Sequence, residues 1–313
     1  MTISSHSSLV RIATRGSQLA LWQAEHVKAR LLAAHPGLTV ELLVLKTMGD
    51  RILDTPLAKI GGKGLFVKEL EQAMLAGEAD LAVHSMKDVP VELPGELHIP
   101  VVLAREDPRD CLVSPRHGGL AGLPQGAVVG TSSLRRRSQL ALLRPDLQLH
   151  DLRGNVTTRL QKLAAGDFDG IVLAQAGLKR LGLTSGISES FAPTQMLPAI
   201  GQGIIGIECR RGDERIEGLI NTLRDADAQD ALAAERALNA RLQGGCQVPI
   251  AGHATIVGET LAIEGMVASL DGREVLRASR HGRREDAAAL GVAVGDALLA
   301  DGAAALLAAI GAH

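Results

Sequence analysis

Leu81-Ala82-Val83-His84-Ser85-Met86-Lys87-Asp88-Val89-Pro90 is the stretch on which the fold prediction depends. Its apolar start predicts a buried strand, and Pro90 predicts a sharp turn after it. A strand that ends in Ser85, Lys87 and Asp88 places polar side chains at the carboxyl edge of a sheet, where open α/β sheets bind ligands. By residue type alone, Lys87 and Asp88 are either a functional pair with perturbed pKa values or an ordinary solvated ion pair.

The segments before this stretch alternate between strand and helix patterns. Strands are predicted at residues 8–12, 40–45 and 80–84, with a helix capped by Ser17 and a second helix at 67–76 between them. The strand at 40–45 is almost continuously apolar, which is typical of parallel sheets covered by helices on both faces. This β-α-β-α-β order indicates an α/β layer.

A second β-α series follows the polar break Arg105-Glu106-Asp107-Pro108, which we interpret as a hinge. Its predicted strands lie near 111–114, 128–129, 147–152 and 170–173, with helices near 133–143, 156–165 and 175–181. An apolar strand at 204–208 comes after this unit and could return to the first sheet. Two crossovers between the lobes would then frame a cleft.

The last third of the chain predicts a small antiparallel α+β domain. A helix pattern ends at Gly244-Gly245, residues 261–267 alternate, Asp271-Gly272 marks a hairpin, and two Ala/Leu-rich helices follow. The expected fold class is therefore α/β, with two lobes around a cleft and a C-terminal α+β domain. The expected domains are residues 1–103 with 204–221, residues 104–203, and residues 222–313.

Length and composition limit the class of protein. The chain has 313 residues, of which 46% are hydrophobic and 22% charged, as in soluble proteins of several domains. A net charge of −2, one tryptophan, three phenylalanines and no tyrosine argue against a nucleic-acid binder. No pattern predicts a signal peptide, a membrane span or a metal site, and three scattered cysteines favour the cytoplasm. We expect a cytoplasmic monomer.

Three strand-to-helix junctions share one pattern, in which a helix start carries a hydroxyl or amide cap and at least one arginine. They are Arg15-Gly16-Ser17, Thr131-Ser132-Ser133-Leu134-Arg135-Arg136-Arg137, and Arg153-Gly154-Asn155 with Arg159 one turn later. Free N–H groups at a helix start and a planar guanidinium both favour anions. Consecutive helical residues point about 100° apart, so at most two of the arginines at 135–137 can face one ligand. Together the junctions predict a ligand with several carboxylates or phosphates.

The connection from Lys46 to Gly64 has no periodicity and is rich in glycine, so we interpret it as a lid; a surface loop without a role is the alternative. Its Gly61-Gly62-Lys63-Gly64 lacks the spacing and the hydroxyl residue of a P-loop, which argues against nucleotide binding. Cys246 lies in a glycine-flanked loop and is a candidate for covalent attachment, whereas Cys111 and Cys209 fall in apolar strands and are expected to be inert.

Four motifs in this order resemble the hydroxymethylbilane synthases, also called porphobilinogen deaminases. They are Val83-His-Ser-Met-Lys-Asp-Val-Pro90, Gly130-Thr-Ser-Ser-Leu-Arg-Arg136, Leu152-Arg-Gly-Asn-Val156 and Gly244-Gly-Cys-Gln-Val-Pro249. The resemblance implies a three-domain enzyme whose first two domains look like a periplasmic-binding-protein pair. Such an enzyme joins four porphobilinogen molecules into the linear tetrapyrrole hydroxymethylbilane and releases ammonia at each addition.

The resemblance also implies the site residues. Asp88 matches the catalytic aspartate, and Cys246 matches the cysteine that holds a dipyrromethane cofactor through a thioether. The residues implied to bind the cofactor are Ser85, Lys87, Asp88, Thr131, Ser133, Arg135, Arg136 and Arg153. The residues implied to bind substrate are Arg15, Ser17, Gln23, Arg153, Arg159, Arg180 and Gln202, and Asp50, Lys59 and Lys63 are assigned to the lid. One departure is Thr47-Met48-Gly49-Asp50, where many relatives carry arginine before the glycine.

A different class of protein shares part of this pattern. A non-catalytic, two-lobed carboxylate-binding protein would have the same arginine-bearing junctions and the same cleft. It has no need for Cys246 or for the third domain, so the C-terminal third of the chain favours the enzyme.

Overall fold

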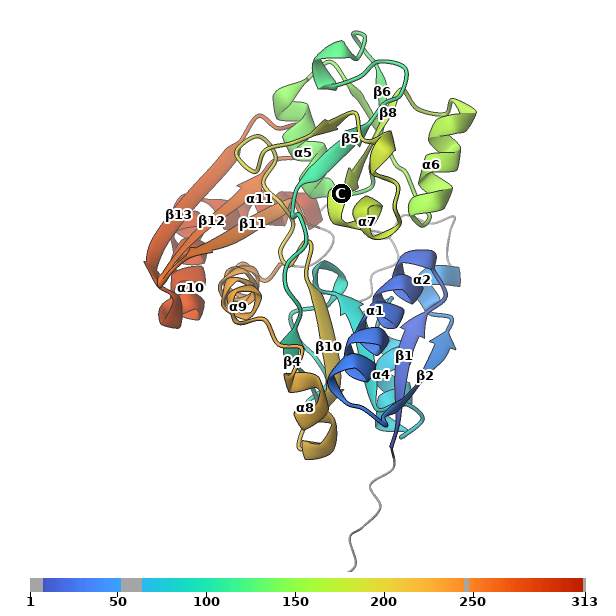
Figure 1. Cartoon of the computed structure of the whole chain (residues 1–313). Coiled ribbons are helices and arrows are strands. Elements are labelled where there is room, and N and C mark those ends of the chain that lie inside the picture. The colour runs from blue at the N-terminus through green and yellow to red at the C-terminus, as the bar shows by residue number, and fades with distance from the viewer. Residues whose placement is uncertain (1–7, 52–63, 245–247, 312–313) are drawn as a thin grey trace, which may run out of the picture.

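The computed structural model describes residues 8–51, 64–244 and 248–311, which form three sheet-based units (Figure 1). Each of the first two units is built on a five-stranded mixed sheet, and the third on a three-stranded antiparallel sheet with helices beside it. This arrangement confirms the predicted fold class, two α/β lobes followed by a small α+β unit. The division at 103/104, 203/204 and 221/222 remains our proposal for the domain boundaries.

The first lobe has the strand order β2-β1-β3-β10-β4. Its strands are β1 (Leu9–Arg15), β2 (Thr39–Leu45), β3 (Leu81–Ser85), β4 (Leu97–Val102) and β10 (Ile205–Arg210), and its helices are α1 (Gln18–Ala34), α2 (Met48–Arg51), α4 (Lys68–Leu75) and α8 (Glu214–Asn221). Strands β1, β2 and β3 are parallel, whereas β10 pairs antiparallel with both β3 and β4. The predicted return of residues 204–208 to the first sheet is confirmed.

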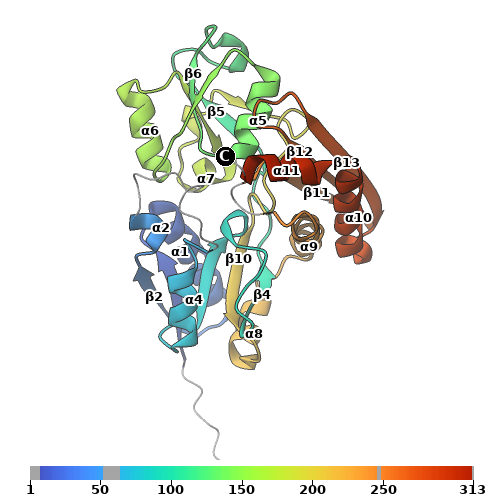
Figure 2. The same ribbon diagram turned by 180° about the vertical axis from the view of Figure 1, so that it is seen from behind.

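The second lobe repeats this plan with the order β7-β6-β8-β5-β9. Its strands are β5 (Asp110–Val113), β6 (Val128–Gly130), β7 (Gln148–His150), β8 (Gly170–Ala174) and β9 (Glu189–Ser190), and its helices are α5 (Leu134–Leu143), α6 (Val156–Ala165) and α7 (Gln175–Arg180). Figures 1 and 2 show two chain segments that join the lobes, one after β4 and one before β10. Strands β6 and β8 are parallel, and each is followed by a helix at its carboxyl end, β6 by α5 and β8 by α7.

The third unit packs two helices and a terminal helix around an antiparallel sheet. It contains α9 (Ala226–Arg241), β11 (Ile250–Val257), β12 (Thr260–Ala268), β13 (Val275–Arg283), α10 (Ala287–Ala300) and α11 (Ala303–Gly311). Its core joins Leu238 of α9, Ile263 of β12 and Leu298 of α10. No single helix among the described residues is long and apolar enough to cross a membrane; only the two C-terminal helices taken together reach that length, and they are bent by 75°.

Some elements differ from the sequence prediction. Strand β2 was expected to be covered on both faces, but it lies at the sheet edge and leaves Val44 51% exposed. Strand β11 and helix α8 were not predicted, because Ile250–Val257 includes a glycine and a histidine and α8 buries only Ile216 and Ile220. Both elements are stabilised by tertiary pairing and packing, which local patterns do not reveal.

Close packing of α10 on α9 gives a stability prediction. A Cβ atom at Gly291 would stand 2.0 Å from the carbonyl oxygen of Ala234 in α9, so the two helix backbones touch there. We expect Gly291→Ala to lower the free energy of unfolding by about 1–3 kcal/mol, as overpacking does. Gly218→Ala in α8 is the matched control: that glycine has open space around it and should gain up to about 1 kcal/mol of helix propensity. Urea unfolding of both variants checks this, and equal midpoints would contradict it.

Candidate active site

The segment that contains Asp88 is held against strand β10. Residues Met86–Asp88 form a short 3₁₀ turn directly after β3, and the Met86 N–H donates to the carbonyl of Ile204 at 3.0 Å. A Cβ atom at Gly206 of β10 would lie 2.2 Å from the Met86 sulfur, so the glycine makes room for that buried side chain. The return of β10 to the first sheet therefore fixes the position of the turn that contains Lys87 and Asp88.

Ser85, the last residue of β3, is joined to helix α1. The side-chain amide of Gln23 donates to the Ser85 hydroxyl at 2.8 Å, and Gln23 is only 3% exposed. At the start of the same helix, Ser17 is the N-cap and accepts a hydrogen bond from the Ala20 N–H, as predicted. The structure thus joins Gln23 to Ser85 and places Ser17 at the start of the helix that carries Gln23.

Charged groups from both lobes meet around Lys87 and Asp88. Burial lowers the pKa of Lys87 to about 8; Asp88 opposes this shift, and Arg136 and Arg159 add to it. The pKa of Arg159 is lowered to about 10 by burial, with Arg136 and Arg153 contributing and Asp88 opposing. These five residues, which we call the cationic cluster, carry four positive charges and one negative charge. Asp110 also acts on Lys87, and with its charge included the positive charges still outnumber the negative ones, which favours an anionic ligand.

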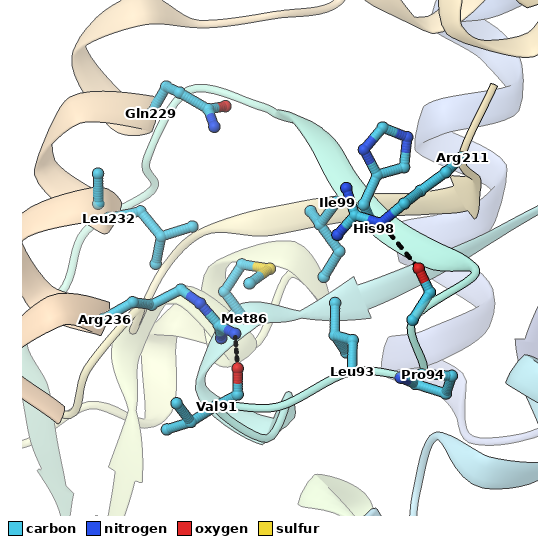
Figure 3. A pocket seen from close by; sticks show the side chains of 12 residues that line it. Met86, Val91, Leu93, Pro94, His98, Ile99, Arg211, Gln229, Leu232 and Arg236 are labelled. Atoms are coloured by element: carbon cyan, nitrogen blue, oxygen red, sulfur yellow. Dashed lines mark hydrogen bonds between the residues drawn. The ribbon is translucent and has the colours of Figure 1, made fainter. Parts of the chain in front are cut away.

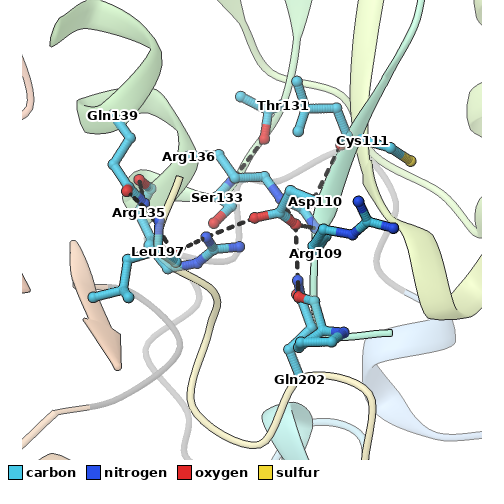
Figure 4. Close-up of polar contacts among 12 residues, drawn as sticks. Arg109, Asp110, Cys111, Thr131, Ser133, Arg135, Arg136, Gln139, Leu197 and Gln202 are labelled. Atoms are coloured by element: carbon cyan, nitrogen blue, oxygen red, sulfur yellow. Dashed lines mark hydrogen bonds and ion pairs between the residues drawn. The ribbon is translucent and has the colours of Figure 1, made fainter. Parts of the chain in front are cut away.

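Arg135 and Arg136 have a counter-ion that the sequence did not reveal. Asp110, fully buried at the start of β5, forms ion pairs with both guanidinium groups at 2.7 and 2.8 Å (Figure 4). These arginines hold the pKa of Asp110 well below its usual range. Gln202 donates to the same carboxylate at 3.0 Å, so the predicted substrate residue Gln202 joins Arg135 and Arg136 in one group. Arg137 instead pairs with Asp151, which agrees with two of the three arginines sharing one side.

Side chains cap or brace the other two predicted helix starts. Asn155 caps α6 by accepting from the Thr158 N–H at 2.9 Å, and the φ of +112° at Gly154 explains the glycine before it. In the other junction, the Thr131 hydroxyl accepts from the Ser133 N–H at 3.2 Å. Across the lobes, the Thr157 hydroxyl donates to the side-chain oxygen of Gln18 at 2.7 Å, so the starts of α6 and α1 face each other.

Two predicted arginines have further contacts. Arg15 lies over the ring of Phe66, 4.3 Å from its centroid, so Phe66 limits the directions in which Arg15 can reach a ligand. Arg180 donates to the carbonyl of Gly203 at 2.7 Å and lies 5.9 Å from the Trp22 ring, and burial lowers its pKa to about 10. Phe66 and Trp22 were not predicted as site residues, because a single aromatic carries no motif.

Several predicted residues fall outside the described part of the chain. Cys246, Lys59 and Lys63 belong to the residues that the structure does not describe, and only the backbone of Asp50, in α2, is described. Cys111 and Cys209 are buried in β5 and β10, as expected, and burial raises the pKa of each thiol to about 12. Neither thiol is available as a nucleophile.

The fold and the cluster together define a two-lobed α/β protein in which arginine, lysine and aspartate side chains from both lobes interact. Comparison with known families agrees with this class. The family model described as "Porphobilinogen deaminase, dipyromethane cofactor binding domain" matches residues 10–218, and "Porphobilinogen deaminase, C-terminal domain" matches residues 230–300. The chain belongs to the porphobilinogen deaminase family. Its activity is the deaminative condensation of porphobilinogen into hydroxymethylbilane, with a dipyrromethane cofactor.

Solved structures with a similar arrangement include two periplasmic proteins. The periplasmic VFT2 domain of BvgS from Bordetella pertussis is 17% identical, with a TM-score of 0.42, over 69% of this chain and 86% of that one. The periplasmic aliphatic sulphonate binding protein SsuA from Escherichia coli is 13% identical, with a TM-score of 0.41, over 76% of this chain and 71% of that one.

Proposed function

We propose that Asp88 is the catalytic carboxylate of this porphobilinogen deaminase, and that the cationic cluster binds the acetate and propionate groups of the growing chain. The observation that carries this proposal is that Asp88 interacts electrostatically with both Lys87 and Arg159, which belong to opposite lobes. Each porphobilinogen brings two carboxylates, so every addition needs more cationic partners. A site in which cations outnumber the carboxylates Asp88 and Asp110 fits a polycarboxylate substrate whose reaction passes through a positive charge.

The chemistry assigns three tasks to Asp88. When a porphobilinogen loses ammonia, its carbon skeleton becomes cationic, and a nearby carboxylate stabilises that charge. The same carboxyl group can protonate the departing amine and later accept the proton released when the new bond forms and the ring regains aromaticity. Lys87 is the adjacent residue, and we propose that it holds a substrate carboxylate while Asp88 handles these protons.

The residues present fit a dipyrromethane with its carboxylate side chains. Among the described residues, Arg135 and Arg136 share one counter-ion, Asp110, and the Arg135 Nε is buried without an acceptor. This spare donor and the spare positive charge can be matched by a cofactor carboxylate. When bound, the dipyrromethane supplies the pyrrole to which substrate units are added. We propose that Ser85, Thr131, Ser133 and Arg153 complete its binding site and that Cys246 attaches it.

The remaining assignments are proposals of the same kind. We propose that Arg15, Ser17, Gln23, Arg180 and Gln202 contact incoming substrate or hold the residues that do, and that residues 46–64, including Asp50, Lys59 and Lys63, close over it. We also propose that the protein is a cytoplasmic monomer, which sedimentation equilibrium and cell fractionation would test.

The wild-type protein provides the direct test of this function. Intact-mass spectrometry of freshly purified protein should show one dipyrromethane above the mass calculated from the sequence, and an acid aldehyde colour reaction should report the pyrroles. Added porphobilinogen should give hydroxymethylbilane and release ammonia in a ratio of one to four. A protein that binds porphobilinogen without releasing ammonia would instead be a carboxylate-binding protein and would refute the proposal.

The lowered pKa of Lys87 predicts a pH effect on substrate binding. A lysine of pKa about 8 is cationic at pH 7 and loses its charge as the pH rises through 8, whereas an ordinary lysine stays charged up to about 10. We expect KM for porphobilinogen to rise by about tenfold between pH 7 and pH 9.5, the size of one lost charged hydrogen bond.

The variants Lys87→Met and Lys28→Met separate this effect from general pH effects. Lys87→Met should have a high KM at pH 7 that no longer rises with pH, because the titrating charge is gone. Lys28, half-exposed on α1 and paired with Glu25, is the control, and its substitution should preserve the wild-type profile. A Lys87→Met profile that still rises through pH 8 would contradict the assignment.

A further inference from the structure

A cavity of about 450 Å³ lies between α9, β4 and the chain segment that follows Asp88 (Figure 3). Its walls combine apolar side chains, among them Met86, Leu93, Ile99 and Leu232, with four polar or charged ones, His98, Arg211, Gln229 and Arg236. This volume lies within the range of about 300–1,000 Å³ that small-molecule sites occupy. None of the residues assigned above to substrate or cofactor binding lines it, so it is separate from the cationic cluster.

Arg236 of α9 gives the cavity a cation that no carboxylate balances. Its guanidinium donates to the carbonyls of Pro90 and Val91, each at 2.9 Å, and forms no ion pair with any described residue. Burial lowers the pKa of this group, and no acidic neighbour offsets the effect. Partly buried charges in proteins are normally paired, so an anion placed beside Arg236 would gain an interaction that the protein leaves unmade.

Gln229, about two turns before Arg236 on α9, has a buried polar atom without a hydrogen-bond partner. Its side-chain oxygen is buried and accepts no hydrogen bond from any described residue. A buried acceptor without a donor costs free energy until a ligand or an ordered water supplies one. Figure 3 shows Gln229 and Arg236 at separate points of the cavity, with Leu232 between them and Ile99 across from Leu232. The ligand that satisfies both groups has a carboxylate at one end and an N–H donor at the other.

We propose that this cavity binds a small heteroaromatic carboxylate with a ring N–H. Its carboxylate pairs with Arg236, its N–H donates to Gln229, and its ring packs on Met86, Leu93 and Ile99. The site is coupled to the proposed catalytic segment, because Met86 directly precedes Lys87 and Arg236 holds the carbonyls of Pro90 and Val91. A bound ligand therefore ties the residues on both sides of Asp88 to the C-terminal domain.

Calorimetric titration of the holoprotein with indole-3-acetate tests the proposal. We expect one site per chain and at least tenfold weaker binding of the uncharged indole-3-acetamide. Benzothiophene-3-acetate, which has sulfur in place of the ring N–H, should bind more weakly to the wild type than indole-3-acetate does. Gln229→Leu should abolish that difference between the two acids. Equal binding of acid and amide would overturn the assignment of Arg236.

Three variants locate the bound probe. Arg236→Met should lose at least tenfold in affinity for indole-3-acetate. Ala233, exposed on the same helix and part of the cavity wall, can be changed to phenylalanine, which should block the cavity with all charges in place. Asp88→Asn should bind the probe as the wild type does. Full binding by Ala233→Phe, or loss of binding in Asp88→Asn, would place the probe elsewhere and overturn the proposal.

Discussion

Asp88→Asn is expected to keep a covalently attached dipyrromethane and to lose about 10²–10⁴-fold in turnover, the contribution that a positioned acid–base group makes. The amide has nearly the same shape as the carboxylate, but at neutral pH it carries no negative charge and cannot act as a general acid or a general base. Asp88 also interacts electrostatically with Lys87 and Arg159, so its replacement removes a negative charge that acts on both cations. Single-turnover measurement of ammonia release checks the prediction.

Two further variants test whether the loss of turnover is due to the position and charge of the Asp88 carboxylate. Asp88→Glu retains the charge but moves it by one methylene, so it should recover part of the lost turnover while Asn does not. Asp296→Asn removes an exposed carboxylate that pairs with Arg241 on the surface and should leave turnover unchanged. Turnover by Asp88→Asn within a few-fold of wild type would assign the proton transfers to another group.

Much of this site could be predicted because its signals are local. Ser17 caps the helix that its sequence context predicts, and Asn155 does the same for α6 with Gly154 at positive φ. The polar end of β3 also follows from a few consecutive residues. In each case the residues that determine the geometry lie within one turn or one strand of each other, so the sequence reveals their arrangement.

Other parts of the site depend on contacts between distant segments. Asp110 was not assigned a role in the sequence analysis. Its pairing with Arg135 and Arg136 requires the start of β5 to lie next to the first turn of α5. The antiparallel insertion of β10 was only one possible return path, yet it fixes Met86 through Ile204 and Gly206. Long-range pairing of this kind leaves no periodic pattern in the sequence, which is why the counter-ion and the cavity beside α9 emerge only from the structure.

Cys246→Ser should remove the dipyrromethane and all detectable hydroxymethylbilane formation. Thioether formation needs an accessible thiol that can ionise. With pKa values raised to about 12, Cys111 and Cys209 would each be ionised in only on the order of one molecule in 10⁵ at pH 7, and both are buried. Cys246 is the remaining cysteine of the chain, and serine in its place cannot form the thioether.

The mass spectrum and the melting temperature together decide this second prediction. Cys246→Ser should show only the mass calculated from its sequence, whereas Cys209→Ala, the matched control, should retain the added dipyrromethane. Because the carboxylates of the attached dipyrromethane can pair with the arginines only in the folded protein, the Cys246→Ser protein should also melt at a lower temperature than the wild type. If the cofactor mass persisted in Cys246→Ser, attachment would lie at another residue. If it were lost in Cys209→Ala as well, the cofactor would depend on the core of the first lobe, where Cys209 packs with Ile207 and Ile216, rather than on one tethering thiol alone.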